Sequence, residues 1–209
     1  MIPVKVLAVR YLPGASDSLC NALGAPKGYP SLAMLTTDCD DATYIALDEA
    51  TKAADVQVCY GSSFYAGAAN ASTPNAGEVI GILAGTTPGT VRSGMEAALA
   101  ALERIGFDEV QGVPYLAHTV SSCGSFLAAE AGVAQGTPLA YLIAPPLESM
   151  YAMDGALKAA DVKLCKLYSP PSETNFGGGL LSGTRSACEA ACDAFAKAVA
   201  EVAGRAIEN

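Results

Sequence analysis

The densest group of chemically active side chains in the sequence is the run Asp38-Cys39-Asp40-Asp41, which follows a predicted strand. Carboxylates gathered at the end of a strand can hold a cation or the ammonium group of a small ligand. The same acids can instead cap the helix that follows and stabilise the positive end of its dipole. The residues alone leave both interpretations open.

Cysteine is the second candidate for chemistry, because the chain has seven of them. The number is odd and no export signal precedes them, so a disulfide framework is not expected. Cys188 and Cys192 lie one helical turn apart and could offer two thiolates to a metal ion. However, they share an apolar stripe at helical spacing with Phe195, Val199 and Val202, which favours a buried core.

Most patterns of catalysis and of cofactor binding are missing from the sequence. The single histidine, His118, lies in a strand-like run, where a packed or surface role is more common than acid–base work. There is no Gly-x-Ser-x-Gly elbow and no phosphate-binding loop. We therefore predict no catalytic residue, no enzyme activity, no metal and no required cofactor. A cysteine-dependent enzyme or redox protein using Cys39 or Cys123 is an alternative.

The composition limits the classes of partner. With 51% hydrophobic and only 16% charged residues, the chain carries less charge than a typical globular protein. Self-assembly with copies of the same chain explains this composition, and so does an Ala-rich fold of small residues. The formal net charge of −9 argues against nucleic acids and against anionic membrane surfaces. No apolar run is long enough to span a bilayer, and the start lacks the pattern of a signal peptide, so we expect a cytoplasmic location.

An internal repeat organises the chain. Residues 48–56 (DEATKAADV) recur as residues 154–162 (DGALKAADV) at an offset of 106, and Cys59 then falls on Cys165. Residues 31–35 match residues 138–142 in the same order. A duplicated domain explains this similarity best. We predict a first domain over residues 1–108 and a second over residues 109–209.

Each half predicts the same order of elements. Strands are expected at residues 4–9, 32–36, 56–60 and 78–83, and again at 113–120, 139–144, 162–168 and, more weakly, 179–181. Short helices are expected at 16–23 and 125–131, and longer ones from Asp40 or Asp41 to about residue 54, and from Pro146 to about residue 160. An amphipathic helix closes each half. This order predicts an α+β fold, an α/β sandwich with helices packed on mostly antiparallel sheets.

Two long loops occupy the same position in the two halves, at residues 61–77 and 169–179. Both are rich in Gly, Ser and Pro, and loops of this length inside compact domains are usually functional or disordered. Glycines allow such loops to change conformation. The rings of Phe64, Tyr65 and Phe176 could close an opening or grip a flat ligand. They could equally anchor the loops to their domains.

The sequence resembles the EutL-type family of shell proteins from ethanolamine-utilisation bacterial microcompartments, which consist of two tandem, circularly permuted BMC domains. The likeness runs from about residue 31 to residue 203. It is carried by residues 40–52, 65–69, 76–79, 140–148 and 170–175.

This resemblance implies a homotrimer shaped as a flat pseudohexamer, which tiles the microcompartment shell within the cytoplasm together with other shell proteins. Threefold symmetry would then gather the long loops around a central, gated pore. Cobalamin is implied as a ligand that is bound or passes through, not as a fixed prosthetic group. The pore residues that the resemblance implies are Phe64, Tyr65, Asn70, Glu173, Asn175 and Phe176.

The resemblance assigns two further pairs of residues. Lys52 and Lys158 match the edge lysines that tile BMC domains side by side. Asp40 and Glu78 match the carboxylates of an ethanolamine site, and a carboxylate is a suitable partner for an ammonium group. The alternative to a shell protein is a protein that binds or senses a small molecule, an amino alcohol or cobalamin, without a shell role.

Overall fold

The computed structural model describes residues 1–64, 75, 77–170, 172 and 174–207. The chain divides into two compact units. The N-terminal unit comprises residues 3–105 together with residues 124–127, and the C-terminal unit comprises residues 1–2, 106–123 and the residues from 128 onward. Each unit therefore includes a short segment from the other half of the sequence.

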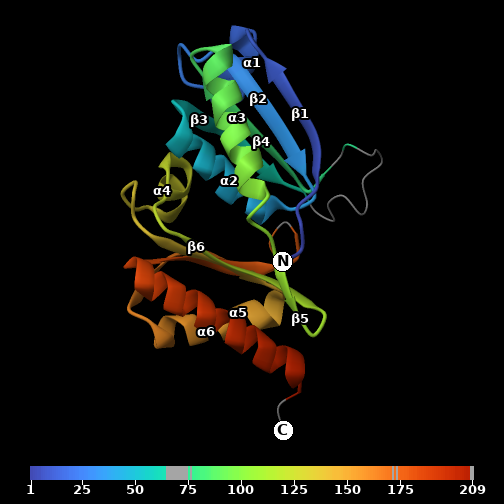
Figure 1. Cartoon of the computed structure of the whole chain (residues 1–209), viewed down its shortest axis with the longest axis vertical. Helices are drawn as coiled ribbons and strands as arrows, with labels where there is room; N and C mark the ends of the chain where they lie inside the picture. Colours follow the sequence, from blue (N-terminus) through green and yellow to red (C-terminus); the bar gives the residue numbers. More distant parts are fainter. Residues whose placement is uncertain (65–74, 76, 171, 173, 208–209) are drawn as a thin grey trace. The chain divides into compact units, whose positions relative to one another are not determined.

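The N-terminal unit is one four-stranded antiparallel sheet with helices on both faces (Figure 1). The strand order is β1-β2-β4-β3. Helices α2 and α3 pack on each other and on the sheet. In chain order the elements are β1 (Val6–Leu12), α1 (Asp17–Ala22), β2 (Ser31–Thr37), α2 (Asp40–Ala53), β3 (Val56–Ser63), β4 (Val79–Gly85) and α3 (Pro88–Leu102).

Alternation along β4 explains why this sheet has two apolar faces. Gly81 and Gly85 point toward the long helices: a Cβ on them would lie 2.4 Å from Leu47 Cδ1 and 2.8 Å from Val91 Cγ1. Residues Ile82 and Ala84 point the other way and form a second cluster with Cys20 of α1. The glycines thus let α2 and α3 approach the sheet closely, while α1 covers the opposite face.

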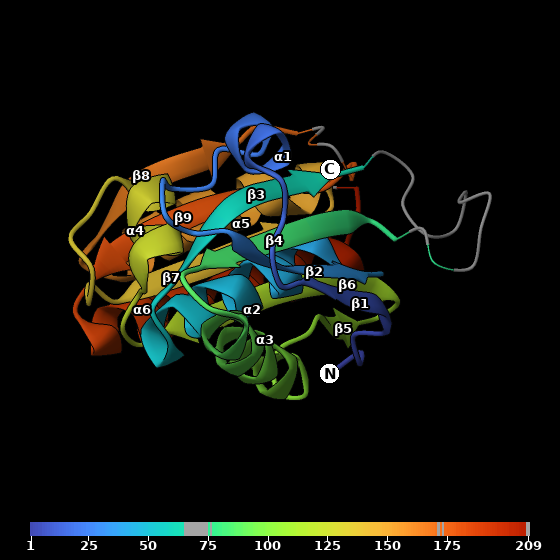
Figure 2. The same cartoon turned by 90° about the horizontal axis from the view of Figure 1, so that it is seen from above.

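The C-terminal unit has a five-stranded antiparallel sheet with strand order β5-β6-β7-β9-β8. Figure 2 shows α5 and α6 side by side along it, in agreement with their extensive packing. Its elements are β5 (Asp108–Val110), β6 (Val113–Val120), the end of α4 (Ser125–Ala131), β7 (Leu139–Ala144), α5 (Pro146–Ala159), β8 (Val162–Tyr168), β9 (Gly177–Gly183) and α6 (Arg185–Gly204).

The cysteine stripe of α6 belongs to the core of this unit. Cys188, Cys192, Phe195 and Val199 are buried in one cluster with residues of β7, β9 and α5. Burial raises the pKa of Cys192 to about 11, so its thiol stays protonated at neutral pH. Among the residues that the structure describes, no group of three or more His, Cys, Asp or Glu side chains could hold a metal ion.

The two units repeat each other in backbone detail. Strands β3 and β8 carry a bulge at the same place, at Cys59 and at Cys165. Gly24 and Gly132 both have a positive φ, and so do Gly28 and Gly136, at a constant offset of 108. Tight turns, rather than helix or strand propensity, require glycine at these four positions. The predicted α+β fold with duplicated domains is confirmed.

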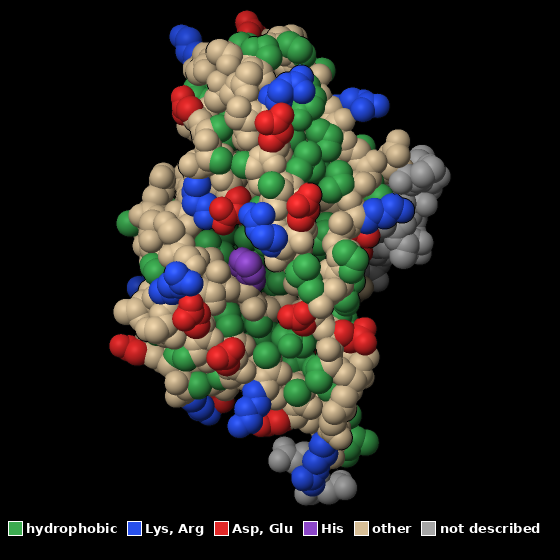
Figure 3. All heavy atoms as spheres, in the orientation of Figure 1, with side chains coloured by type: hydrophobic (Ala, Val, Ile, Leu, Met, Phe, Trp, Pro, Cys, Tyr) green, Lys and Arg blue, Asp and Glu red, His purple; other side chains and the backbone are tan. Residues whose placement is uncertain are grey.

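Charged side chains of both signs are mixed over the surface visible in Figure 3. None of the described helices offers the long apolar stretch that crossing a bilayer requires.

Candidate functional site

Glu78 is held at one end of the sheet of the N-terminal unit. Its backbone N–H donates to the carbonyl of Thr37 at 2.8 Å, and its carbonyl accepts from the N–H of Phe64 at 2.7 Å. Glu78 is thereby linked to the ends of β2 and β3. Gly77 permits this approach, because a Cβ there would lie 2.0 Å from the Thr37 carbonyl oxygen.

Asp40 lies beside this strand end as the first residue of α2. The helix cap is Cys39, which makes no capping hydrogen bond through its side chain, so the interpretation of Asp40 or Asp41 as the helix cap is wrong. Hydroxyls hold the turn instead: Thr37 Oγ1 accepts from the N–H of Cys39 at 3.1 Å and lies 2.7 Å from Thr43 Oγ1. The buried Asp40 carboxylate is left to bond the side chain of Ser63.

The electrostatics of this site favour a cation. Burial raises the pKa of Asp40. Burial, followed by the charges of Asp40 and Asp38, raises the pKa of Glu78 to about 7. A carboxylate whose ionisation is opposed by burial and by neighbouring acids is stabilised by a positive ligand beside it. Asp40 and Glu78, which the family resemblance pairs, are 38 positions apart in the chain, yet the charge of Asp40 acts on Glu78.

Two hydroxyl groups at this site escaped the sequence analysis. Tyr44 Oη lies 2.7 Å from Ser63 Oγ, which in turn bonds Asp40. The spacing of Asp40 and Tyr44, one helical turn apart, could have indicated the tyrosine. Ser63 at the end of β3 carried no such signal. Together these groups add donors and acceptors suited to a ligand hydroxyl beside an ammonium.

Cys39 does not provide a nucleophile here. Burial, and after it the charge of Asp41, raises the pKa of its thiol. Since the thiolate is the reactive species, a thiol that stays protonated is a poor nucleophile. The acidic site is thus suited to binding rather than to bond chemistry.

The predicted loop residues fall partly within the described part of the chain. Phe64 follows β3 and is exposed. Phe176 precedes β9, and its ring packs edge-on against Phe107 at 5.7 Å between centroids. Asn175 is exposed and has a φ of 66°. Tyr65, Asn70 and Glu173 lie outside the described residues.

The two repeat-related lysines end their helices but differ in environment. Lys52 of α2 pairs with Glu49, and 27% of its side chain is exposed. Lys158 of α5 pairs with Asp154, and 75% of its side chain is exposed. Both cations suit the negative end of a helix dipole.

Comparison with known families agrees with the duplicated sandwich. The BMC domain family matches residues 31–113. The match begins at β2 and leaves β1 and α1 in front of it, an order consistent with circular permutation of the domain. Fold and match together define a protein of the BMC-domain class.

A curated relative is more specific. The chain is 54% identical over 207 residues to the bacterial microcompartment shell protein EutL of Clostridium perfringens, covering 97% of this chain and 95% of the relative. The chain belongs to the EutL family of bacterial microcompartment shell proteins.

Solved structures resemble the chain along its whole length. The crystal structure of the ethanolamine utilization protein EutL from Leptotrichia buccalis superposes with a TM-score of 0.97 at 55% identity, covering all of this chain and 98% of that one. A trimeric microcompartment shell protein, PduB, superposes with a TM-score of 0.80 at 19% identity, covering 96% and 89% of the two chains. The second likeness is one of fold alone.

Proposed function

We propose that this chain is a structural tile of a bacterial microcompartment shell for ethanolamine utilisation, assembled as a homotrimer with a gated central pore. The observation that carries this proposal is the duplicated fold in a chain of the EutL family. Two similar domains in each chain give six in a trimer, so a closed ring of three copies has nearly sixfold symmetry. Such a disc can meet equal neighbours on every side, as a shell requires.

The pore follows from the position of the loops. Residues 64–78 and 169–176 connect equivalent strands, β3 to β4 and β8 to β9, so the predicted loop bounds 61–77 and 169–179 each overlap a strand by three residues. Around a threefold axis, three copies of each loop would face one another. Rearrangement of these loops would open or close the passage, without any bond chemistry. A passage of this kind would admit substrates or a bulky cofactor such as cobalamin.

Assembly tests the proposal. Sedimentation velocity is expected to give the mass of three chains of 21.1 kDa, and electron microscopy at high concentration is expected to show flat hexagonal sheets. The double variant Lys52→Asp, Lys158→Asp should keep the trimer and lose the sheets, because both lysines are proposed to act at the outer edge. A chain that stays monomeric at high concentration would overturn the proposal.

Asp40 and Glu78 are proposed to bind ethanolamine within this tile. The ammonium group would lie between the two carboxylates, and its hydroxyl would meet Ser63 or Tyr44, which the hydrogen bonds above bring to the same place. Charge-assisted bonds of this kind are shorter and stronger than neutral ones.

The affinity for ethanolamine is expected to depend on pH. Because the pKa of Glu78 is about 7, its carboxylate is mostly protonated at pH 6 and mostly ionised at pH 8, while the amine stays protonated throughout. Affinity should therefore rise roughly tenfold from pH 6 to pH 8 and then level off. Calorimetric titrations across this range measure it, and Glu78→Gln should weaken binding and flatten the profile. An affinity that falls with rising pH would contradict the assignment of Glu78.

A further inference from the structure

One stripe of α5 is exposed although its counterpart in α2 is covered. Leu147 and Tyr151 are 63% and 50% exposed, and the side chain of Asp154 is 63% exposed. At the offset of 106, the matching residues of α2 are Asp41, Ile45 and Asp48, all of which are buried. Both halves of the repeat therefore contain this helix, but only in the C-terminal unit is the stripe exposed to solvent.

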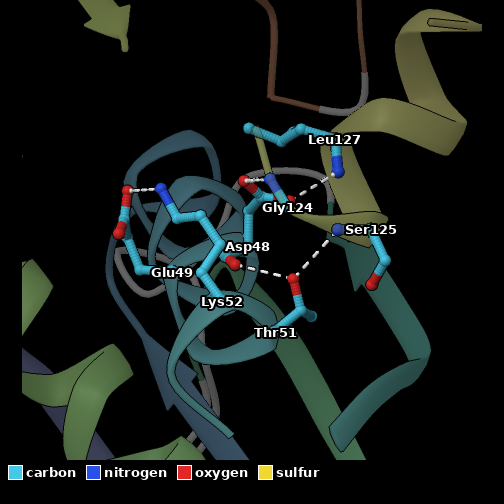
Figure 4. A network of polar contacts seen from close by, with 7 residues as sticks. All are labelled: Asp48, Glu49, Thr51, Lys52, Gly124, Ser125 and Leu127. Carbon is cyan, nitrogen blue, oxygen red and sulfur yellow. Dashed lines mark hydrogen bonds and ion pairs between the residues drawn. The ribbon is translucent and has the colours of Figure 1, made fainter. Parts of the chain in front are cut away.

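The N-terminal unit shows what covers Asp48, the last residue of this stripe in α2. The Asp48 carboxylate accepts hydrogen bonds from the N–H groups of Gly124 at 2.7 Å and Leu127 at 2.8 Å (Figure 4). Thr51 Oγ1 accepts from the N–H of Ser125 at 3.1 Å. Residues 124–127, where α4 begins, thus sit on α2 as part of the same compact unit.

Helix α1 is the repeat counterpart of α4. Helices α1 and α4 begin at Asp17 and Ser125, an offset of 108. The turns after them also correspond, since Ala25 N–H donates to Cys20 and Val133 N–H donates to Ala128. Leu19 therefore matches Leu127.

The start of α1 is as exposed as the stripe of α5. Leu19 is 40% exposed, whereas Leu127 is 1% exposed. Ser16 and Asp17 are also exposed. The chain therefore carries an exposed counterpart of each side of the Asp48 contact, one in each unit.

We propose that the exposed stripe of α5, formed by Leu147, Tyr151 and Asp154, docks the start of α1 from a second copy of this chain. Asp154 takes the place of Asp48, and Leu19 takes the place of Leu127. This inference rests on the proposed assembly and deepens it, because it names the surfaces by which copies meet. The two surfaces differ, so the contact is head to tail and can close into a ring.

In this contact the Asp154 carboxylate accepts from the N–H of Ser16. The N–H of Leu19 is already bonded within α1, because Ser16 Oγ accepts from it at 3.4 Å. The fit is looser than in the N-terminal unit. There Gly124 is required, because a Cβ would lie 2.2 Å from Thr51 Oγ1. In α5 the matching residue is Leu157, which has no hydroxyl, and α1 has Ser16 in place of the glycine.

Two variants test the inference from opposite sides of the contact. Asp154→Arg places a cation against the start of α1, and Leu19→Asp places a charge against the apolar part of the α5 stripe. Each is expected to weaken association at least tenfold in sedimentation equilibrium, with an unchanged circular dichroism spectrum. Asp193→Arg, which reverses an exposed acid on α6, is the matched control and should associate as the unmodified chain does.

A cross-link locates the contact directly. With cysteines at Ser16 and Asp154, mild oxidation should join peptides containing these two positions between different chains, as identified by mass spectrometry. A pair at Ser16 and Asp193 should not join. A trimer that persists in both charge variants and yields no 16–154 cross-link would overturn this inference while leaving the proposed function intact. An unmodified chain that is monomeric would instead overturn the proposed function.

Discussion

Replacing Asp48 with alanine is expected to destabilise the N-terminal unit by about 3 kcal/mol, because two buried N–H groups lose their acceptor. Asp48 is fully buried and accepts from Gly124 and Leu127. The melting temperature should fall by roughly 6–12 °C for a chain of this size.

Two further variants make the Asp48 result interpretable. Asp48→Asn keeps one acceptor oxygen and should lose less stability than alanine. Glu189→Ala removes a carboxylate from an exposed pair with Arg185, and surface pairs of this kind contribute about 0–1 kcal/mol. Thermal denaturation of all three, followed by circular dichroism, measures the differences. If Asp48→Ala and Glu189→Ala had the same melting temperature, the hydrogen bonds from Asp48 to the start of α4 would contribute nothing to stability.

Regular elements with clear periodicity could be predicted from the sequence. Strand β6, helix α4 and strands β7 and β8 begin and end where the pattern placed them. Strand β9 was underestimated, because its first three residues are glycines that hide the apolar alternation. Strand β5 was missed, since three residues carry no periodicity.

The sites show where sequence reasoning stops. The acidic run was visible in the sequence, but the pairing of Asp40 with Glu78 came only from family resemblance, because side chains 38 positions apart leave no local signal of contact. The cap of α4 by Asp48 spans 76 positions and was missed for the same reason. Its repeat partner, Asp154, was visible only as part of the duplicated motif. Comparing the environments of repeated residues, rather than the residues themselves, revealed the unequal stripe on α5.

Replacing Gly178 with alanine is expected to disrupt the C-terminal sheet, at a cost of about 4 kcal/mol or more. Its φ is 150°, and a Cβ there would lie 1.9 Å from the carbonyl oxygen of Leu142 on the neighbouring strand. That oxygen belongs to the backbone of β7, so no side-chain rotation can relieve the overlap. In the N-terminal unit the strand equivalent to β9 is β4, which has Ile80 at the matching position. The requirement for glycine is therefore specific to β9.

Hydrogen exchange of β7 and β9 measures the effect of Gly178→Ala directly. Faster exchange there, with unchanged exchange in the N-terminal unit, is the expected result, because the strain falls on one sheet. Gly14→Ala is the matched control: a Cβ there meets nothing within 4 Å, so stability should change by less than about 0.5 kcal/mol. Because β9 follows directly on Phe176, the variant should also loosen the packing of that ring on Phe107. Equal stability of the two glycine variants would show that β9 can shift away from β7 at little cost. The close approach of Gly178 to Leu142 would then not hold the segment that precedes β9 in place.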